Sequence, residues 1–545
     1  MRTKVLLFFI FLIIISTSGF SQTLPVGISE NVEDAYRRQQ LLGNDHSNSS
    51  YMIRPLNISG LNLGLDPDSA EYSLNNFSKL IYGNQKKKIE VYALPVTLNQ
   101  QFNSHHPYGF NDGSMIQARG YQMQVSAGIF AKVGLFSVQF RPEFVAAENK
   151  NFTTLQESNT ASEFKNGNFK HQVQIDYPER YGRGGYTRAF WGQSSIRLNI
   201  DPISFGLSTE NLWWGPGVRN SLLMSNTAPG FKHLTLNTTR PVNIKIGHIE
   251  AQIVAGRLDQ SGIPIDSSAV IATTPKPDDW RYFSGFILTY QPKWVPNLFL
   301  GIDHSYIVDH ESMRHGLTDY LGFLQKRQGQ YTSFFARYVM PESKAEAYIQ
   351  YGRNNQSIYD AADVPNRVEH ARAYIVGFRK LIPLRSRDEF IQLGVEFTQL
   401  EKPLSPNRGD NGITWYNDYQ SRDGYTQLGQ VMGAGIGPGS NLQSLDVAWV
   451  KGLKKIGLGI ERTLQNNDMF YDSQTTDGRR HWVDMAFIGK FNWAYNQLIF
   501  SSQIAYIHSF NYHYGLIQAA DAPVWVWDHQ DANNLHAQVG VMYKF

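Results

Sequence analysis

Two adjacent tryptophans, Trp213 and Trp214, precede a Gly-Pro-Gly turn at 215–217 in a segment that is both apolar and rich in amides. The run Leu-Leu-Met at 222–224 follows, flanked by asparagine, serine and threonine. Aromatic planes can cover the apolar faces of a sugar ring, while amide and charged side chains can bond its hydroxyls. A solvated loop rarely carries so much apolar surface, so we expect this segment to fold back onto another part of the chain.

The same mixture of aromatic, amide and charged residues recurs at 177–186, 415–419 and 525–529. Trp and Tyr also form anchoring girdles in membrane barrels, and that packing role is the alternative for roughly half of these side chains. For the tryptophan pair, packing and ligand contact are equally supported. The candidate ligand-binding residues are Trp213, Trp214, Arg219, Asn220, Asn226, Tyr181, Arg183, Trp415, Tyr416 and Trp525.

The sequence offers little catalytic or metal-binding chemistry. His310 and His315 stand one residue too far apart for a zinc HExxH motif, and on a helix they would point about 140° apart. The glycine-rich stretch 433–439 lacks the lysine of a phosphate-binding loop, so tight turns explain it better. We therefore predict a protein that is not an enzyme and that uses neither a metal nor a cofactor. A hydrolase with dispersed Ser, His and Asp residues is an alternative.

The N-terminus predicts export. Arg2 and Lys4 precede an apolar run at 5–15, and small residues then lead to a cleavage site expected after Ser21. This run is too short for a spanning helix and is typical of a secretory signal peptide, here residues 1–21. The chain contains no cysteine, so neither a disulfide nor lipoprotein acylation is possible. A formal net charge of only +3 gives no argument for binding nucleic acid.

Several segments alternate apolar and polar residues with the period of a β-strand. Phe136, Val138 and Phe140 interleave with polar residues, and the same alternation marks 195–200, 249–253 and 391–398. The last residues alternate likewise up to the C-terminal Phe545, an ending that resembles the signal read by outer-membrane assembly machinery. We therefore predict an all-β protein, a transmembrane β-barrel of the outer membrane.

Loop lengths predict the number of strands. Nine long polar stretches lie near 103–118, 148–188, 215–240, 259–279, 309–328, 354–370, 402–440, 466–480 and 511–533. Between them fall eight short breaks, at Lys132, 201–202, 247–248, 292–296, 341–342, 385–387, 452–454 and Tyr495. Together they join 18 antiparallel strands, with long loops outside and short turns periplasmic. The break at 247–248 is the least distinct, and 16 strands are the alternative.

The barrel is expected to occupy residues 86–545, after a periplasmic N-terminal segment at 22–85. Ser29 is a plausible N-cap and Gly43 a plausible stop signal, which predicts a short helix over 29–42. A flexible leader is the alternative. An even strand number places both chain ends in the periplasm, and the expected surroundings are outer-membrane lipid around a monomer.

Five stretches resemble the capsule assembly protein Wzi family, in order along nearly the whole predicted barrel. They are 210–217, 220–231, 106–113, 334–338 and 437–441. The resemblance implies an 18-strand outer-membrane barrel with helical structure on the periplasmic side, acting as a lectin that holds capsular or extracellular polysaccharide at the cell surface. This chain departs from the enterobacterial type by large insertions near 148–188 and 402–440. A sugar-selective diffusion channel is the second hypothesis for the function, and an outer-membrane hydrolase is the third.

Overall fold

The computed structural model describes residues 22–27, 30–45, 47–57, 78–84, 86, 88–158, 160–265, 276, 278–313, 317–320, 322, 329–354, 372–386, 388–402, 414–418, 420–473, 477–517 and 521–545. The predicted signal peptide and the predicted N-cap Ser29 lie outside the described residues. No helix among the described residues is long and apolar enough to cross a membrane.

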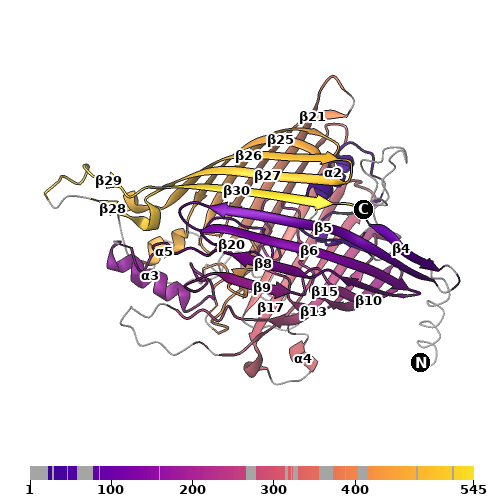
Figure 1. The fold of residues 1–545 in the computed structure, drawn as a ribbon, viewed down its shortest axis with the longest axis horizontal. Coiled ribbons are helices and arrows are strands. Elements are labelled where there is room, and N and C mark those ends of the chain that lie inside the picture. Colours follow the sequence, from indigo (N-terminus) through magenta and orange to yellow (C-terminus); the bar gives the residue numbers. More distant parts are fainter. Residues whose placement is uncertain are drawn as a thin grey trace.

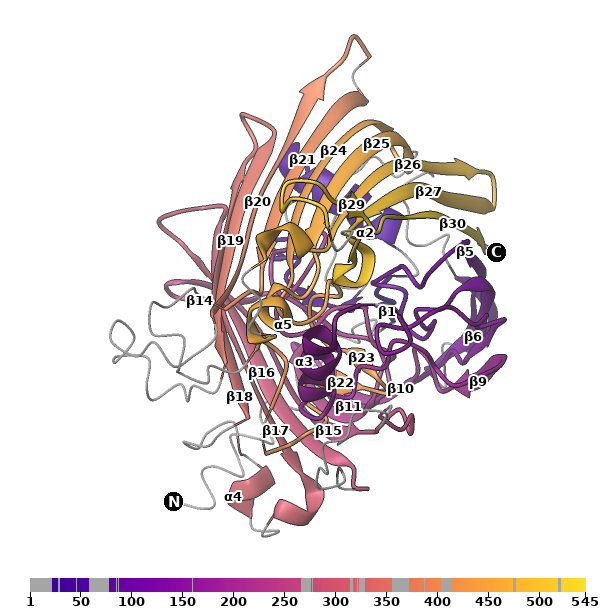
Figure 2. The same ribbon diagram turned by 90° about the vertical axis from the view of Figure 1, so that its left-hand side faces the viewer.

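One antiparallel sheet closes on itself to form a barrel (Figure 1, Figure 2). The seam is formed by the last strand, β30 (Ala532–Tyr543), which pairs with β5 (Ile89–Asn103). The strands between them along the wall are β6 (Gly120–Val133), β7 (Phe136–Phe140), β8 (Glu143–Ala147), β9 (Tyr186–Phe190), β10 (Ser195–Ile200), β11 (Ile203–Ser208), β13 (Lys232–Thr238), β14 (Val242–Ile244), β15 (Gly247–Leu258), β16 (Arg281–Pro292), β17 (Leu298–Asp309), β18 (Gln330–Met340), β19 (Ala345–Asn354), β20 (Arg372–Pro383), β21 (Glu389–Gln399), β24 (Asn441–Lys451), β25 (Lys454–Leu464), β26 (Val483–Tyr495) and β27 (Leu498–Phe510).

The closed wall has 18 strands, which confirms the predicted number over the alternative of 16. Three wall strands are each interrupted once, so that β7 with β8, β9 with β10, and β13 with β14 each count as a single strand. The first interruption falls at Arg141-Pro142, where proline cannot donate a ladder hydrogen bond.

The third long loop differs from its predicted bounds of 215–240. It spans 209–231, because Lys232–Thr238 forms strand β13 and pairs with β11 and β15. The neighbouring turn was expected at 247–248 but lies at 245–246, since Gly247 already begins β15. The alternation in β13 was not recognised because Thr235 and Asn237 are typical of loops, although in the structure they face the polar lumen.

Side chains alternate between the two faces of the wall as predicted. In β7, Phe136, Val138 and Phe140 are exposed on the outside, whereas Ser137 and Gln139 are buried inside. Apolar side chains face outward in the same way on the other wall strands. The inward side chains are polar over part of the wall, whereas on β15 to β21 they include buried apolar residues such as Val254, Phe283 and Ile287. An apolar outer belt around a polar interior is the pattern of a barrel that spans a membrane.

The N-terminal segment enters the barrel at the end that carries the short turns. Its helix α2 (Glu30–Leu41) confirms the predicted helix over 29–42, and Gly43 follows with a φ of +74°, as a helix stop requires. Leu24, Val32 and Tyr36 are buried with Met542 and Leu453 of the wall. Short strands β1 (Thr23–Leu24), β2 (Ile53–Arg54) and β3 (Leu56–Asn57) flank the helix. Strand β4 (Lys79–Asn84) was not predicted from the sequence.

The remaining elements belong to the loop end of the barrel (Figure 2). They are β12 (Trp213–Trp214), α3 (Ser162–Gln172), η3 (His310–Ser312), α4 (Leu317–Tyr320), β22 (Thr426–Gln427), β23 (Gln430–Val431), α5 (Asn467–Asp472), η6 (Gly478–Arg480), η7 (Tyr512–Tyr514), β28 (Leu516–Ile517) and β29 (Asp528–His529).

Candidate functional site

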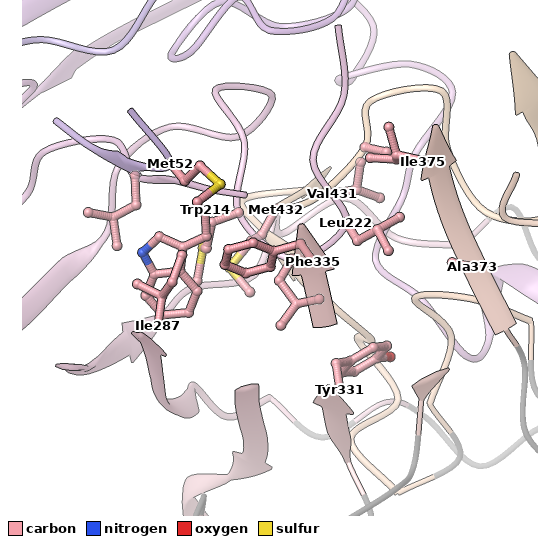
Figure 3. Close-up of a cluster of buried hydrophobic side chains, with 14 of the residues drawn as sticks. Met52, Trp214, Leu222, Ile287, Tyr331, Phe335, Ala373, Ile375, Val431 and Met432 are labelled. Carbon is pink, nitrogen blue, oxygen red and sulfur yellow. The ribbon is translucent and has the colours of Figure 1, made fainter. Parts of the chain in front are cut away.

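The third long loop, 209–231, folds into the lumen as a plug. Its strand β12 pairs with β2 of the N-terminal segment, so two distant parts of the chain meet inside the barrel. Trp214 is completely buried, and its indole N–H donates to Gln252 of the wall at 2.8 Å. Figure 3 shows Trp214 packed with Met52, Ile287 and Met432. The predicted fold-back of this loop is therefore present.

The seventh long loop supplies the other half of this apolar plug. Trp415 and Tyr416 are completely buried, and the Tyr416 hydroxyl donates to the Leu222 carbonyl at 2.8 Å. The same hydroxyl accepts from the Ala434 amide at 2.6 Å. A Cβ at Gly433 would lie 2.2 Å from the Leu222 carbonyl oxygen, so this glycine permits close backbone approach. The glycine-rich stretch thus serves packing.

Buried carboxylates of the wall hold the polar side of the plug. Glu396 accepts hydrogen bonds from the backbone amides of residues 218, 219 and 220 at 2.7, 3.0 and 2.8 Å. The Arg219 guanidinium makes a bidentate pair with Glu461, at 2.8 and 2.9 Å, and lies 3.8 Å from the centre of the Phe110 ring. Two-pronged pairs of this kind fix geometry as well as charge. Arg219 therefore joins two loops to one wall strand.

The candidate amides are also engaged inside the plug. Asn220 donates to the Thr398 hydroxyl at 3.1 Å. Asn226 accepts from the Asn211 amide and donates to the Asn111 carbonyl, both at 2.7 Å. Both side chains are buried, so they satisfy loop backbone and wall groups in the structure.

An ionic cluster holds the N-terminal helix at the turn end. Asp34 of α2 contacts Arg379, Arg38 and Lys455. Burial alone would raise the pKa of Asp34, but these three cations hold it well below its ordinary value. On the same helix, Arg37 pairs with Glu346 of β19 at 2.9 Å, and both side chains are buried. The helix is thus fixed to the wall by charge as well as by its apolar face.

A polar cavity of about 250 Å³ remains between the plug, the helix and one side of the wall. Its lining includes Asn99, Lys490, Gln503 and Asp446 from the wall, with Tyr108 from the first long loop. The opposite side of the lumen is filled by the apolar plug core (Figure 3). The lumen is therefore occupied from the loop end by three loops and from the turn end by α2.

The other candidate residues lie closer to the surface of the loop end. Tyr181 is buried, and its hydroxyl donates to the Gly429 carbonyl at 2.7 Å, which ties the second long loop to the plug. Arg183 is exposed. Trp525 is 78% exposed, on the protruding loop between β28 and β29 (Figure 1).

The predicted residues therefore fall into two groups. Seven share the plug, namely Trp213, Trp214, Arg219, Asn220, Asn226, Trp415 and Tyr416, and Tyr181 borders it through Gly429. Arg183 and Trp525 stand apart from it with accessible side chains. The ring faces of Trp214, Trp415 and Tyr416 are covered by protein atoms, because the apolar residues of these loops are buried in the lumen away from water. Contact with a ligand remains a prediction for all ten, and the geometry favours it for the exposed pair.

One cluster at the loop end was missed from the sequence. Trp280 stacks on His310 with ring centres 4.2 Å apart, and the Arg257 guanidinium lies 5.2 Å from the indole. Asp279 approaches the His310 ring at 3.8 Å. The only sequence signal was an isolated tryptophan at the end of a polar loop. Within the described ranges, no three or more His, Cys, Asp or Glu side chains group so as to hold a metal ion.

Known proteins resemble this chain in sequence and in fold. The family model of the capsule assembly protein Wzi matches residues 99–496. No curated protein matches the chain. The solved structure of Wzi from Escherichia coli, described as an outer-membrane, carbohydrate-binding β-barrel involved in group 1 capsule assembly, aligns with a TM-score of 0.62 at 11% identity, covering 96% of this chain and 100% of that one. OccAB2 of Acinetobacter baumannii aligns at 0.40 and 11%, covering 83% and 98%.

Proposed function

Because this chain belongs to the capsule assembly protein Wzi family, we propose that it binds capsular or extracellular polysaccharide at its loop end and helps to attach it to the cell surface. The family match carries this proposal. The occupied lumen supports it, since a ligand outside the cell would meet the loop surface rather than an open pore.

The contact surface we propose combines aromatic and charged groups of four loops and of the end of strand β15. Trp525 and the Trp280–His310 pair offer ring faces, while Arg183 and Arg257 offer hydrogen-bond donors. This combination fits the apolar faces and hydroxyls of sugars. The protein acts without catalysis, as an exported monomer whose signal peptide is cleaved and whose two ends lie in the periplasm.

A binding assay and a conductance assay together test the proposal. Polysaccharide from the cells that make this protein is immobilised, and the detergent-solubilised protein is passed over it. We expect saturable binding, and no steady conductance when the same protein is placed in planar bilayers. Steady conductance without binding would instead support the sugar-selective channel.

A further inference from the structure

Strand β4 is the one segment of the large sheet, within the described residues, that extends the barrel instead of closing it. It pairs only with the first part of β5, from Lys79 opposite Ala93 to Asn84 opposite Ile89. The last strand, β30, pairs with the rest of β5, beginning at Val96. Strand β4 therefore continues the line of β30 at the turn end, past the point where that strand stops (Figure 1).

Three consecutive apolar side chains of β4 are exposed. Leu80, Ile81 and Tyr82 keep 52%, 60% and 51% of their surface, and the register shifts between Leu80 and Tyr82. Apolar side chains therefore stand free on a strand that has no core to cover. At the same level of the wall, Ile129 and Val133 of β6 also present apolar surface outward, at 48% and 50% exposure. The outer apolar belt thus continues onto β4.

Lysines follow immediately beyond this apolar surface. Lys86 and Lys88 are exposed in the turn between β4 and β5, and Lys79 is exposed at the other end of β4, opposite Ala93. The Lys88 carbonyl accepts from the Gly134 amide at 3.0 Å, which brings the next turn alongside. Lys132 of β6 stands opposite Glu90 on the inner face of the wall, because Ile129 and Val133 of the same strand face outward. Glu90 is the single acidic residue in 78–92 and 130–136. The surface is therefore cationic directly where the apolar belt ends.

We propose that the hairpin of β4 and β5 binds anionic phospholipids of the leaflet at the turn end. Leu80, Ile81 and Tyr82 lie in the region where acyl chains meet headgroups, and the lysines bind the phosphate groups. Clusters of lysine beside a membrane-embedded segment attract anionic lipid. The lysines complement an anionic partner, and the exposed Leu80, Ile81 and Tyr82 beside them favour phospholipid over an acidic protein surface, because acyl chains can cover apolar side chains.

Lipid selectivity in nanodiscs tests the charged part of the proposal. Wild type, a triple variant K79Q/K86Q/K88Q and a control K245Q/K293Q/R385Q are reconstituted with phosphatidylethanolamine and phosphatidylglycerol, and bound lipids are counted by native mass spectrometry. The control removes three cations from other turns at the same end of the barrel. We expect the preference for phosphatidylglycerol to fall roughly fivefold or more in the hairpin variant and much less in the control. An unchanged preference, or equal losses in both variants, would overturn the proposal.

A site-specific label tests the apolar part. Since the chain has no cysteine, Ile81→Cys provides a unique position for an environment-sensitive fluorophore, and Ser343→Cys in another exposed turn is the matched control. We expect blue-shifted emission at position 81 that nitroxide-labelled phospholipid quenches, with water-like emission at 343. Water-like emission at both positions would show that β4 stands clear of the bilayer.

Discussion

At the scale of single residues, the sequence indicates which side chains could contact a sugar, but it does not indicate which of them are buried. Trp213 and Trp214 were expected either to pack inside the protein or to contact a ligand, and the structure buries both in the lumen. A tryptophan that packs and a tryptophan that stacks on sugar have the same local sequence, because the difference lies in contacts with Gln252 and Met52 far along the chain. Exposure alone separates them, and it depends on how the loops fold.

Removing the Trp214 side chain should loosen the plug without dismantling the wall. Trp214→Ala leaves a large cavity and leaves the side-chain oxygen of Gln252 without the indole donor, at a cost of about 3–5 kcal/mol to the packing of the loops. We expect a correctly inserted barrel that shows new conductance in planar bilayers. The control is Trp191→Ala, which removes a ring that is 61% exposed. If the Trp214 variant shows no new conductance, other loop contacts are sufficient to close the lumen.

Removing the Trp525 ring should affect binding and spare stability. Because Trp525 is 78% exposed, Trp525→Ala loses little packing, yet it removes a ring worth about 0.5–1.5 kcal/mol in a stacking contact. We expect polysaccharide affinity to fall about three- to tenfold with an unchanged melting temperature. Trp294→Ala removes a ring that is 68% exposed at the turn end, and it should change neither quantity. Equal affinities for all three proteins would exclude the protruding loop from the contact surface.

At the scale of elements, period-two alternation predicted most of the wall strands, and loop lengths gave their number. Strand β13 was not predicted because its inward residues are polar and its threonines are typical of loop segments. Strand β4 was not predicted because its apolar residues are consecutive instead of alternating with polar ones. Neither the destination of the loops nor the pairing of β2 with β12 follows from local pattern, since both depend on long-range contacts.

The attachment of α2 should depend on the Asp34 carboxylate. Since its pKa is lowered in the folded protein, its contribution is fully present above the ordinary value of about 4 and is lost as pH falls through the lower folded value. Asp34→Asn leaves Arg379 and Lys455 without this anion, a loss of about 3–5 kcal/mol for a buried pair.

Hydrogen exchange across residues 30–41 is the measurement for this prediction. We expect lower protection factors in the Asp34 variant at neutral pH, and the protection factors of wild type should fall to that level only in strong acid. The exposed Asp388→Asn provides the matched control. Identical exchange in all three proteins would show that the apolar face alone holds the helix.

At the scale of the whole molecule, the barrel is divided between two ends with different tasks. The turn end contains α2 and the exposed lysines of the β4–β5 hairpin. The loop end carries aromatic and charged groups above the plug. The wall itself positions the loops and keeps them at the membrane. This division is what a surface attachment protein needs, because its ligand stays outside and nothing large has to pass through.

The most direct test of this account is the fraction of polysaccharide that stays attached to cells. It is measured in wild-type cells, in a strain that lacks this protein, and in that strain supplied with the gene again. We predict that the attached fraction falls in the deletion strain while the shed fraction rises, with the total unchanged and the loss reversed by the gene. An unchanged attached fraction in the deletion strain would contradict the account.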